Sequence, residues 1–498
     1  MIFTDKYNRL FHNIAYILAW VLLLAGLYFM AWTTLFTETG NGDNVEHVHA
    51  TWLIATGNVP YRDFFQHHHP LLWYMFAPFI KSVPNVLVML NLAHAIGIIT
   101  GVLAFFIVYK ICTRFFASSF ASLCSLLILC PPYYYIFCFN YNPDTFMALF
   151  YALGLYFLLE YWDKKQLYAL CFAFNLFFIA FLFTQKMLSV VVVLGVIFLY
   201  MLFKQKTPWI HVFYALLVPV LCIILGITIL YKEDMLDLYW KCNYVFNIVM
   251  QKYYGFNKVA VMDHERLILP CVTASCGILW TIKSQNILYK IISVLFVTEL
   301  LQRCFYFSIA PYYLLPLMIY ICILNSVFID KMIQKHFILI FIFLGISTYY
   351  LCISKNSYID DRGQDRSFTR YISNNVNRCD YVISAYLSNH SIANKDPHYY
   401  WSILGHVDMA GEESGTGEHP NLNDVVLKYK PKLIYGGDYF SSYHQNRGQE
   451  VFIQRVSPQI IDQYYLPTPF ENIYLLKYEY QKRDCRYDEK RGDWYYAD

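Results

Sequence analysis

The sequence predicts a polytopic α-helical membrane protein that ends in a small α/β domain. Hydrophobic residues make up 58% of the 498 residues, and only 15% are charged. Apolar runs recur between Ile14 and Cys352, and many have the roughly 17 to 25 residues that cross a bilayer. After about residue 355 the composition becomes charged and polar. We therefore predict a membrane domain over residues 1–354 and an extracytoplasmic soluble domain over residues 355–498.

The apolar runs predict about eleven transmembrane helices, at 13–36, 86–109, 116–132, 145–162, 168–184, 187–203, 210–231, 266–282, 287–303, 308–328 and 337–354. One set of short loops is rich in Lys and Arg, as at Lys110, Arg114 and Lys164. By the positive-inside rule these loops face the cytoplasm. The N-terminus is then cytoplasmic. The loops 43–70 and 232–265, and the chain after residue 354, lie outside, in the periplasm of a bacterium.

Two stretches of the first outer loop are predicted to be helices lying along the membrane surface. From Asn44 to Thr56, the apolar residues Val45, Val48 and Trp52 have the spacing of an amphipathic helix. The stretch from Leu71 to Ile80 is too short to span a bilayer and too apolar for water. We expect both helices at the interface.

The soluble domain is predicted from short apolar stretches. Strands are expected at 381–385, 432–435 and 473–478, and a helix at 423–427 with Asn421 or Asn423 as its cap. Cys379 and Cys485 are the only cysteines in this part of the sequence. They can pair if the domain lies in an oxidising compartment, but the sequence does not decide whether they do.

The first outer loop concentrates ionisable residues. Residues 43–70 contain Asp43, Glu46, Asp63 and five of the fifteen histidines, and Glu38 lies just upstream. Asp43 precedes Glu46 by three residues, so one helical turn places both on one face. A carboxylate at the membrane surface can accept the proton of an attacking hydroxyl. Asp is also a favoured N-cap, so from the residues alone Asp43 has two interpretations.

The histidines of this loop are candidates for a zinc or manganese site with Asp43 or Glu46; they are His47, His49, His67, His68 and His69. However, the HExxH spacing is absent, and tandem histidines are expected to point in different directions. We therefore expect these side chains to form hydrogen bonds or to contact phosphate. A divalent metal is a possible cofactor but not an expected one, and no other cofactor is predicted.

Ionisable residues also occur at the outer ends of predicted spans. Asp144 opens the fourth span, Lys186 lies between the fifth and sixth, and Glu299 and Arg303 lie near the end of the ninth. Such groups are costly at membrane depth and usually face a cavity. Together they fit a pocket for a lipid phosphate, whose charge the cations stabilise. The alternatives are an ion pair between Glu299 and Arg303 and a snorkelling Lys186.

Several motifs resemble those of bacterial GT-C glycosyltransferases in the dolichyl-phosphate-mannose protein mannosyltransferase-like group, which includes the lipid A aminoarabinose transferase. In the first outer loop these are Asp43, Glu46-His47-Val48-His49, residues 57–65 and His68-His69-Pro70. Asn142-Pro143-Asp144 resembles the group's Arg-Pro-Asp motif, with Asn142 in place of Arg. Gln185-Lys186 and the run 311–316 are also similar.

The resemblance implies a GT-C fold with two interfacial helices after the first span, a sugar donor on a polyprenyl monophosphate, and an active site on the outer face. Asp43 matches the group's catalytic aspartate, and Asp144 its second acidic position. Asn44 stands where many relatives have Glu, so Glu46 is the candidate to replace that acid. The candidate substrate-binding residues are His47, His49, Tyr61, Arg62, Asp63, His68, His69, Lys186, Arg303, Tyr312 and Tyr313.

The predicted function is an inverting membrane glycosyltransferase in which Asp43 accepts the acceptor's proton while the lipid phosphate leaves. The acceptor is a glycolipid, a polysaccharide or a protein, and no nucleic acid is expected as a partner. The alternative is a transporter or flippase of a lipid-linked intermediate, but transporters usually carry their charged groups near the midplane. A third possibility is an inactive scaffold, against which Asp43, Asp144 and Lys186 argue.

Overall fold

The computed structural model describes residues 2–36, 42–83, 86–135, 139–204, 207–254, 265–305, 314–335, 339, 341–342, 345–346, 348–349, 371–372, 374–384, 394, 399, 413–416, 421–435, 456–470, 473–482, 485–488 and 493–496. The chain groups into two compact units. The first comprises residues 1–37, 94–226 and 254–360, and the second comprises residues 38–93, 227–253 and 361–498. The predicted domain boundary near residue 355 lies outside the described residues.

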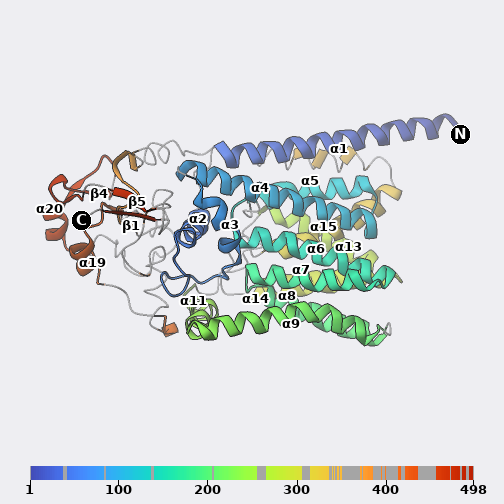
Figure 1. Cartoon of the computed structure of the whole chain (residues 1–498). Coiled ribbons are helices and arrows are strands. Elements are labelled where there is room, and N and C mark those ends of the chain that lie inside the picture. The colour runs from blue at the N-terminus through green and yellow to red at the C-terminus, as the bar shows by residue number, and fades with distance from the viewer. Residues whose placement is uncertain are drawn as a thin grey trace. The chain divides into compact units, whose positions relative to one another are not determined.

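The first unit is a bundle of apolar helices, several of which lie side by side in Figure 1. The helices that match predicted spans are α1 (Ile2–Phe36), α4 (Val86–Ile111), α5 (Ser119–Tyr135), α6 (Pro143–Lys164), α7 (Leu167–Phe183), α8 (Met187–Lys204), α9 (Trp209–Lys232), α13 (Glu265–Lys283), α14 (Ile287–Phe305) and α15 (Leu315–Lys335). A π-helical turn, η1 (Cys112–Phe116), follows α4. Most of the predicted span 337–354 lies outside the described residues.

Within the described residues, five helices are long and apolar enough to cross a membrane: Asn13–Trp32, Val88–Phe116, Pro143–Lys164, Trp209–Lys232 and Leu315–Lys335. This confirms the multi-pass class, whereas the count of about eleven spans stays a prediction. The α6 and α15 helices are buried along most of their length, and α9 exposes apolar side chains such as Phe213 and Leu221. Such helices suit the interior and the lipid-facing edge of a bundle.

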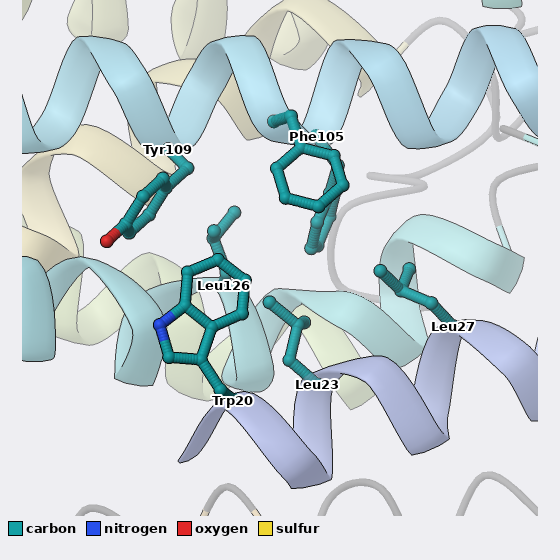
Figure 2. A pocket seen from close by; sticks show the side chains of 7 residues that line it. Trp20, Leu23, Leu27, Phe105, Tyr109 and Leu126 are labelled. Carbon is teal, nitrogen blue, oxygen red and sulfur yellow. The ribbon is translucent and has the colours of Figure 1, made fainter. Parts of the chain in front are cut away.

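Small residues allow close helix packing in this unit. A Cβ atom on Gly277 of α13 would lie 2.4 Å from the backbone oxygen of Leu324 in α15, so only glycine fits this crossing. Elsewhere α1, α4 and α5 surround a small pocket (Figure 2), whose lining is Trp20, Leu23, Leu27, Phe105, Phe106, Tyr109 and Leu126. Its aliphatic and aromatic lining is typical of contacts between membrane helices.

In the second unit, the first outer loop forms the two predicted helices. They are α2 (Gly42–Ala55) and α3 (Leu71–Lys81), which pack against each other. The amphipathic prediction for α2 is wrong, because every residue from Asn44 to Leu53 is buried. Its polar side chains face partners inside the protein, so a polar residue on this helix does not mark a face in water. The second outer loop contributes α10 (Leu236–Trp240), a π-helical segment η2 (Lys241–Val245) and α11 (Phe246–Tyr254).

The C-terminal residues of the second unit form a four-stranded sheet with the order β1-β2-β4-β3. Its strands are β1 (Val382–Ser384), β2 (Leu433–Tyr435), β3 (Tyr465–Pro467) and β4 (Ile473–Leu476). The β1 and β2 strands are parallel, and β2–β4 and β4–β3 are antiparallel. A hairpin of β5 (Cys485–Asp488) and β6 (Asp493–Tyr496) and the helices α19 (Leu422–Tyr429) and α20 (Pro458–Tyr464) complete the described elements.

These elements agree with the sequence predictions for the described part of this region. Strands occur at all three predicted places, and the side chain of Asn421 caps α19 by accepting a hydrogen bond from the backbone N of Asn423 at 3.1 Å. Cys379 and Cys485 form a disulfide with a Cα–Cα distance of 5.8 Å, which links residues 106 positions apart. The sequence left that pairing open, and the structure supplies it.

Candidate functional site

The α2 helix buries several polar side chains. Glu46, His47 and His49 are exposed by only 4%, 2% and 1%. The helix ends where Asn58 donates to the Leu53 carbonyl from both its backbone N and its side chain, each at 3.0 Å. Gly57 has a φ of +93°, a conformation that glycine adopts without strain. This turn reverses the chain, so the following loop returns its histidines toward α2.

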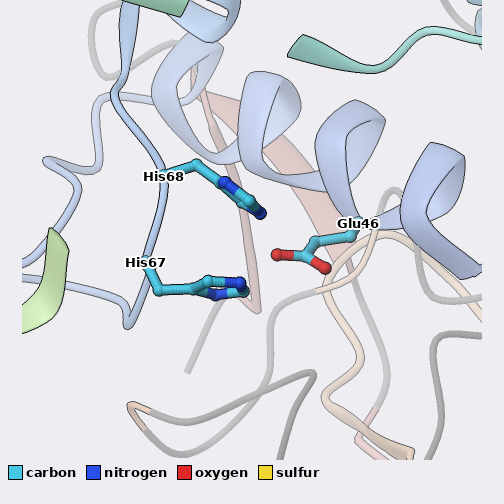
Figure 3. A group of neighbouring side chains, drawn as sticks. All are labelled: Glu46, His67 and His68. Carbon is cyan, nitrogen blue, oxygen red and sulfur yellow. The ribbon is translucent and has the colours of Figure 1, made fainter. Parts of the chain in front are cut away.

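Glu46 meets two of these histidines. Ligand atoms of Glu46, His67 and His68 all lie within 4.8 Å of one another, and Figure 3 shows both imidazole rings beside the carboxylate. The two ring centroids are 4.1 Å apart. The expectation that tandem histidines point in different directions is therefore wrong for this pair. The chain bends at His68, so the alternation of side chains along an extended strand does not apply.

Gln66 connects the carboxylate to the histidine loop. Its Nε2 donates to Glu46 Oε1 at 2.8 Å, and its Oε1 accepts from the backbone N of His67 at 3.2 Å. Gln66 is 1% exposed, so both hydrogen bonds are shielded from water. The sequence analysis did not single out Gln66, because an amide next to three histidines carries no signal of its own.

His47 lies beside this cluster and contacts both Trp73 and His68. The indole Nε1 of Trp73, in α3, donates to His47 Nδ1 at 3.3 Å, and the two rings are stacked. An imidazole nitrogen that accepts a hydrogen bond carries no proton, so neutral His47 is protonated on Nε2. The ring of His47 also lies 5.2 Å from that of His68. His49 stacks on Trp52 within α2 at 5.6 Å.

Side chains from both outer loops contact the histidine run. Asn247 Nδ2 donates to the His67 carbonyl at 2.9 Å. The Tyr61 hydroxyl donates to the His68 carbonyl at 2.6 Å, and burial raises the pKa of this phenol well above its ordinary value. His69 Nε2 lies 3.4 Å from the Tyr244 hydroxyl. Asn247 and Tyr244 were not predicted, since their contacts join two loops that are far apart in the sequence.

Arg62 and Asp63 pair with each other on a more exposed part of the loop. Arg62 Nε lies 3.0 Å from Asp63 Oδ1, and Asp63 Oδ2 also accepts from the backbone N of Val59 at 2.7 Å. The hydrogen bond from Arg62 lowers the pKa of the Asp63 carboxyl group. This pair stabilises the turn, and its substrate contact stays a prediction.

The first unit contains a second buried carboxylate, Asp144, at the start of α6. Asn142 caps this helix by accepting from the backbone N of Asp144 at 3.0 Å, and Pro143 occupies the first turn, where no backbone N–H is needed. Lys186, in the turn between α7 and α8, places its Nζ 3.0 Å from Asp144 Oδ2 and 3.3 Å from Oδ1. Lys186 is thus paired with a carboxylate, which replaces the snorkelling alternative.

Other predicted residues are only partly described. Asp43 lies in the first turn of α2, three residues before Glu46, and Arg303 lies in α14, but the side chains of both are outside the described part of the structure. Three further candidates lie entirely outside the described residues: Glu38, Tyr312 and Tyr313. Glu299 is buried in α14 at 3% exposure, and its predicted ion pair with Arg303 stays a prediction.

The comparisons with known proteins agree with the resemblance in the sequence. Residues 68–231, which include His68, Asp144 and Lys186, match the dolichyl-phosphate-mannose-protein mannosyltransferase family. The crystal structure of apo ArnT from Cupriavidus metallidurans has the same fold, with a TM-score of 0.60 and 11% identity over 86% of this chain and 94% of that one. ArnT from the same organism bound to undecaprenyl phosphate gives a TM-score of 0.62 and 11% identity, over 92% and 97%. No curated protein sequence matches the chain.

Proposed function

We propose that this chain, which resembles the protein mannosyltransferase and ArnT group in its family match and its fold, is a membrane glycosyltransferase. Its donor is a sugar linked to a polyprenyl phosphate, and its acceptor is a glycolipid, a polysaccharide or a protein outside the membrane. The observation that carries the proposal is the family match over residues 68–231, which contains the ion pair between buried Asp144 and partly buried Lys186. The ArnT structure with bound undecaprenyl phosphate supports the choice of lipid.

Asp43 is the proposed general base. It lies in the first turn of α2, three residues before Glu46 along the helix. Asp43 accepts the proton of the acceptor hydroxyl as the oxygen attacks the anomeric carbon, and the bond from that carbon to the phosphate oxygen breaks. A single displacement of this kind inverts the configuration at the sugar. Glu46 is the second candidate, because it is the buried carboxylate next to Asp43 along the helix.

Lys186 is the proposed contact for the donor phosphate. Its side chain is 18% exposed while that of Asp144 is 2% exposed, so the ammonium group lies on the more accessible side of the pair. A fixed cation stabilises the charge that develops on a leaving phosphate. Asp144 holds Lys186 in one position, so it is a positioning residue for the phosphate contact. We place Arg303 in the same role on the strength of the sequence resemblance.

The topology completes the proposal. The N-terminus is cytoplasmic, the first and second outer loops and the C-terminal region are periplasmic, and the membrane is the bacterial inner membrane. A hexosyl or pentosyl group is transferred. The runner-up function is transport of a lipid-linked intermediate, for which the apolar helices alone would suffice.

The test uses membrane vesicles that contain the protein and a panel of undecaprenyl-phosphate sugars with labelled hexose or pentose. Release of undecaprenyl phosphate is measured, because this product is the same for every acceptor. We expect release with at least one donor in vesicles that contain both the protein and cell-envelope acceptors. Movement of labelled donor across the bilayer, without any release of undecaprenyl phosphate, would instead identify a transporter.

A further inference from the structure

We propose that Glu46, His67 and His68 form a binding site for a divalent transition-metal ion of the zinc type. This site does not rest on the proposed transferase function. A carboxylate oxygen and two imidazole nitrogens are the donor set of many zinc sites, and here their ligand atoms lie within 4.8 Å of one another (Figure 3). The site lies within the second unit, between α2 and the loop that follows it.

The spacing suits coordination after a small closure. In a tetrahedral zinc site with bonds of about 2.1 Å, neighbouring ligand atoms are about 3.4 Å apart. The three side chains must therefore approach by roughly one ångström or less each, which side-chain rotation supplies. The geometry needs no HExxH helix, because the bend at His68 brings adjacent histidines to one carboxylate.

Hydrogen bonds hold both ligand-bearing segments. Gln66 donates to Glu46 Oε1, which orients the carboxylate that we assign to the metal. The carbonyls of His67 and His68 accept from Asn247 Nδ2 and the Tyr61 hydroxyl at 2.9 Å and 2.6 Å. Outer hydrogen bonds of this kind fix the direction of metal ligands and raise affinity.

His47 lies next to the proposed ligands, but we do not assign it to the metal. Its Nδ1 accepts the indole hydrogen of Trp73, so the lone pair with which a neutral ring would bind a metal is already used in this hydrogen bond. We assign His47 to the wall beside His68, with which its ring makes an edge contact. The described residues thus supply three ligands, and a tetrahedral ion has a fourth position for water.

We assign this ion the task of fastening the histidine loop to α2. The loop from Gly57 to Pro70 has no regular secondary structure beyond a single bridge between Pro60 and Phe64. A metal bond between Glu46 and two loop histidines crosslinks the helix to this loop. Binding of metal to the folded state alone raises its stability by mass action.

The experiment measures the metal itself. Full-length protein without a histidine tag is purified in detergent, incubated with Zn²⁺, passed through a desalting column and analysed for zinc by mass spectrometry. We expect about one zinc per chain in the wild type. Glu46→Gln, His67→Gln and His68→Gln should each retain little zinc, whereas His69→Gln, in the same histidine run, should retain as much as the wild type. Gln66→Ala should bind zinc roughly 10- to 100-fold more weakly.

The thermal unfolding temperature separates loss of the site from loss of the fold. We expect EDTA to lower it for the wild type and for His69→Gln, and to leave it unchanged for a monodisperse Glu46→Gln protein. Wild-type protein that retains no zinc would overturn the proposal, as would equal retention in Glu46→Gln, His67→Gln, His68→Gln and His69→Gln. No sugar donor is used, so this failure leaves the transferase proposal standing.

Discussion

Two buried carboxylates of this chain, Glu46 and Asp144, have contrasting surroundings. Glu46 faces two imidazoles and accepts a hydrogen bond from an amide, all from one loop. Asp144 faces the ammonium group of Lys186, which lies 42 residues along the chain. The sequence suggested a catalytic part for both residues. The structure indicates that Asp144 holds a cation, whereas Glu46 belongs to a group of potential metal ligands.

The difference follows from how a buried negative charge is compensated. A carboxylate loses its hydration on burial and needs a cation or several hydrogen bonds in return. The Asp144–Lys186 pair supplies full charge compensation without any bound ion. The described groups around Glu46 include an amide and two imidazoles, and a dication in the proposed metal site adds positive charge there. The predictions below test this contrast.

The largest effect is expected from Lys186→Met, which leaves the Asp144 carboxylate buried without its cation. Breaking one partner of a buried pair costs about 3–5 kcal/mol of unfolding free energy. Unfolding of the protein in detergent measures this loss. The matched control is Lys283→Met at the exposed end of α13, for which we expect a change within about 0.5 kcal/mol. Equal stability of the two variants would show that Asp144 does not depend on Lys186.

The double variant Asp144→Asn/Lys186→Met separates stability from function. Removing both charges should restore much of the stability lost in Lys186→Met, because no unpaired charge remains. The affinity for undecaprenyl phosphate should stay low because the phosphate contact is gone. This affinity is measured from the rise in the thermal unfolding temperature that the lipid causes. Wild-type binding by a well-folded double variant would remove Lys186 from the donor site.

A smaller effect is expected from Glu46→Gln. The amide keeps the shape of the side chain and an oxygen that can accept from Gln66, so this hydrogen bond persists without its charged character. We expect a loss of about 1–2 kcal/mol in metal-free protein, below that of Lys186→Met. Unfolding in EDTA measures it. A loss as large as that of Lys186→Met would mean that Glu46 pairs with a fixed cation, as Asp144 does.

The smallest effect is expected from Asp63→Asn, which removes an exposed partner of Arg62. The hydrogen bond from Arg62 lowers the folded-state pKa of Asp63, so its contribution to stability is present above the unfolded pKa and lost as pH falls through the folded pKa. Because the pair is exposed, the contribution is at most about 1 kcal/mol. The stability gap between wild type and variant should be present at pH 7 and close as the pH falls through the lowered folded-state pKa of Asp63. A gap that widens on acidification would contradict this.

Local features of the structure were predictable from the sequence. The two helices of the first outer loop, the Asn421 cap and the strands around Val382, Leu433 and Ile473 follow from composition, periodicity and capping rules. The sequence also pointed to the candidate site residues, because carboxylates and histidines cluster in one loop and ionisable residues occur at the ends of predicted spans.

Features that depend on packing were not predictable. The amphipathic interpretation of α2 failed because its polar side chains are buried, and periodicity cannot distinguish water from a polar interior. The convergence of His67 and His68 on Glu46 depends on one bend in an irregular loop. The Asp144–Lys186 pair needs α6 to pack against α7, which no local pattern specifies.

The central claim is that Asp43 serves as the base of a polyprenyl-phosphate-dependent sugar transfer. The most direct measurement is the rate of labelled-sugar transfer in membrane vesicles for wild type, Asp43→Asn and the control Asp237→Asn, which alters an exposed acid of α10 paired with Lys241. We predict a loss of at least about 100-fold for Asp43→Asn, with undecaprenyl phosphate binding retained, and wild-type transfer for Asp237→Asn. Unchanged transfer by Asp43→Asn would contradict the account and move the search for the base to Glu46.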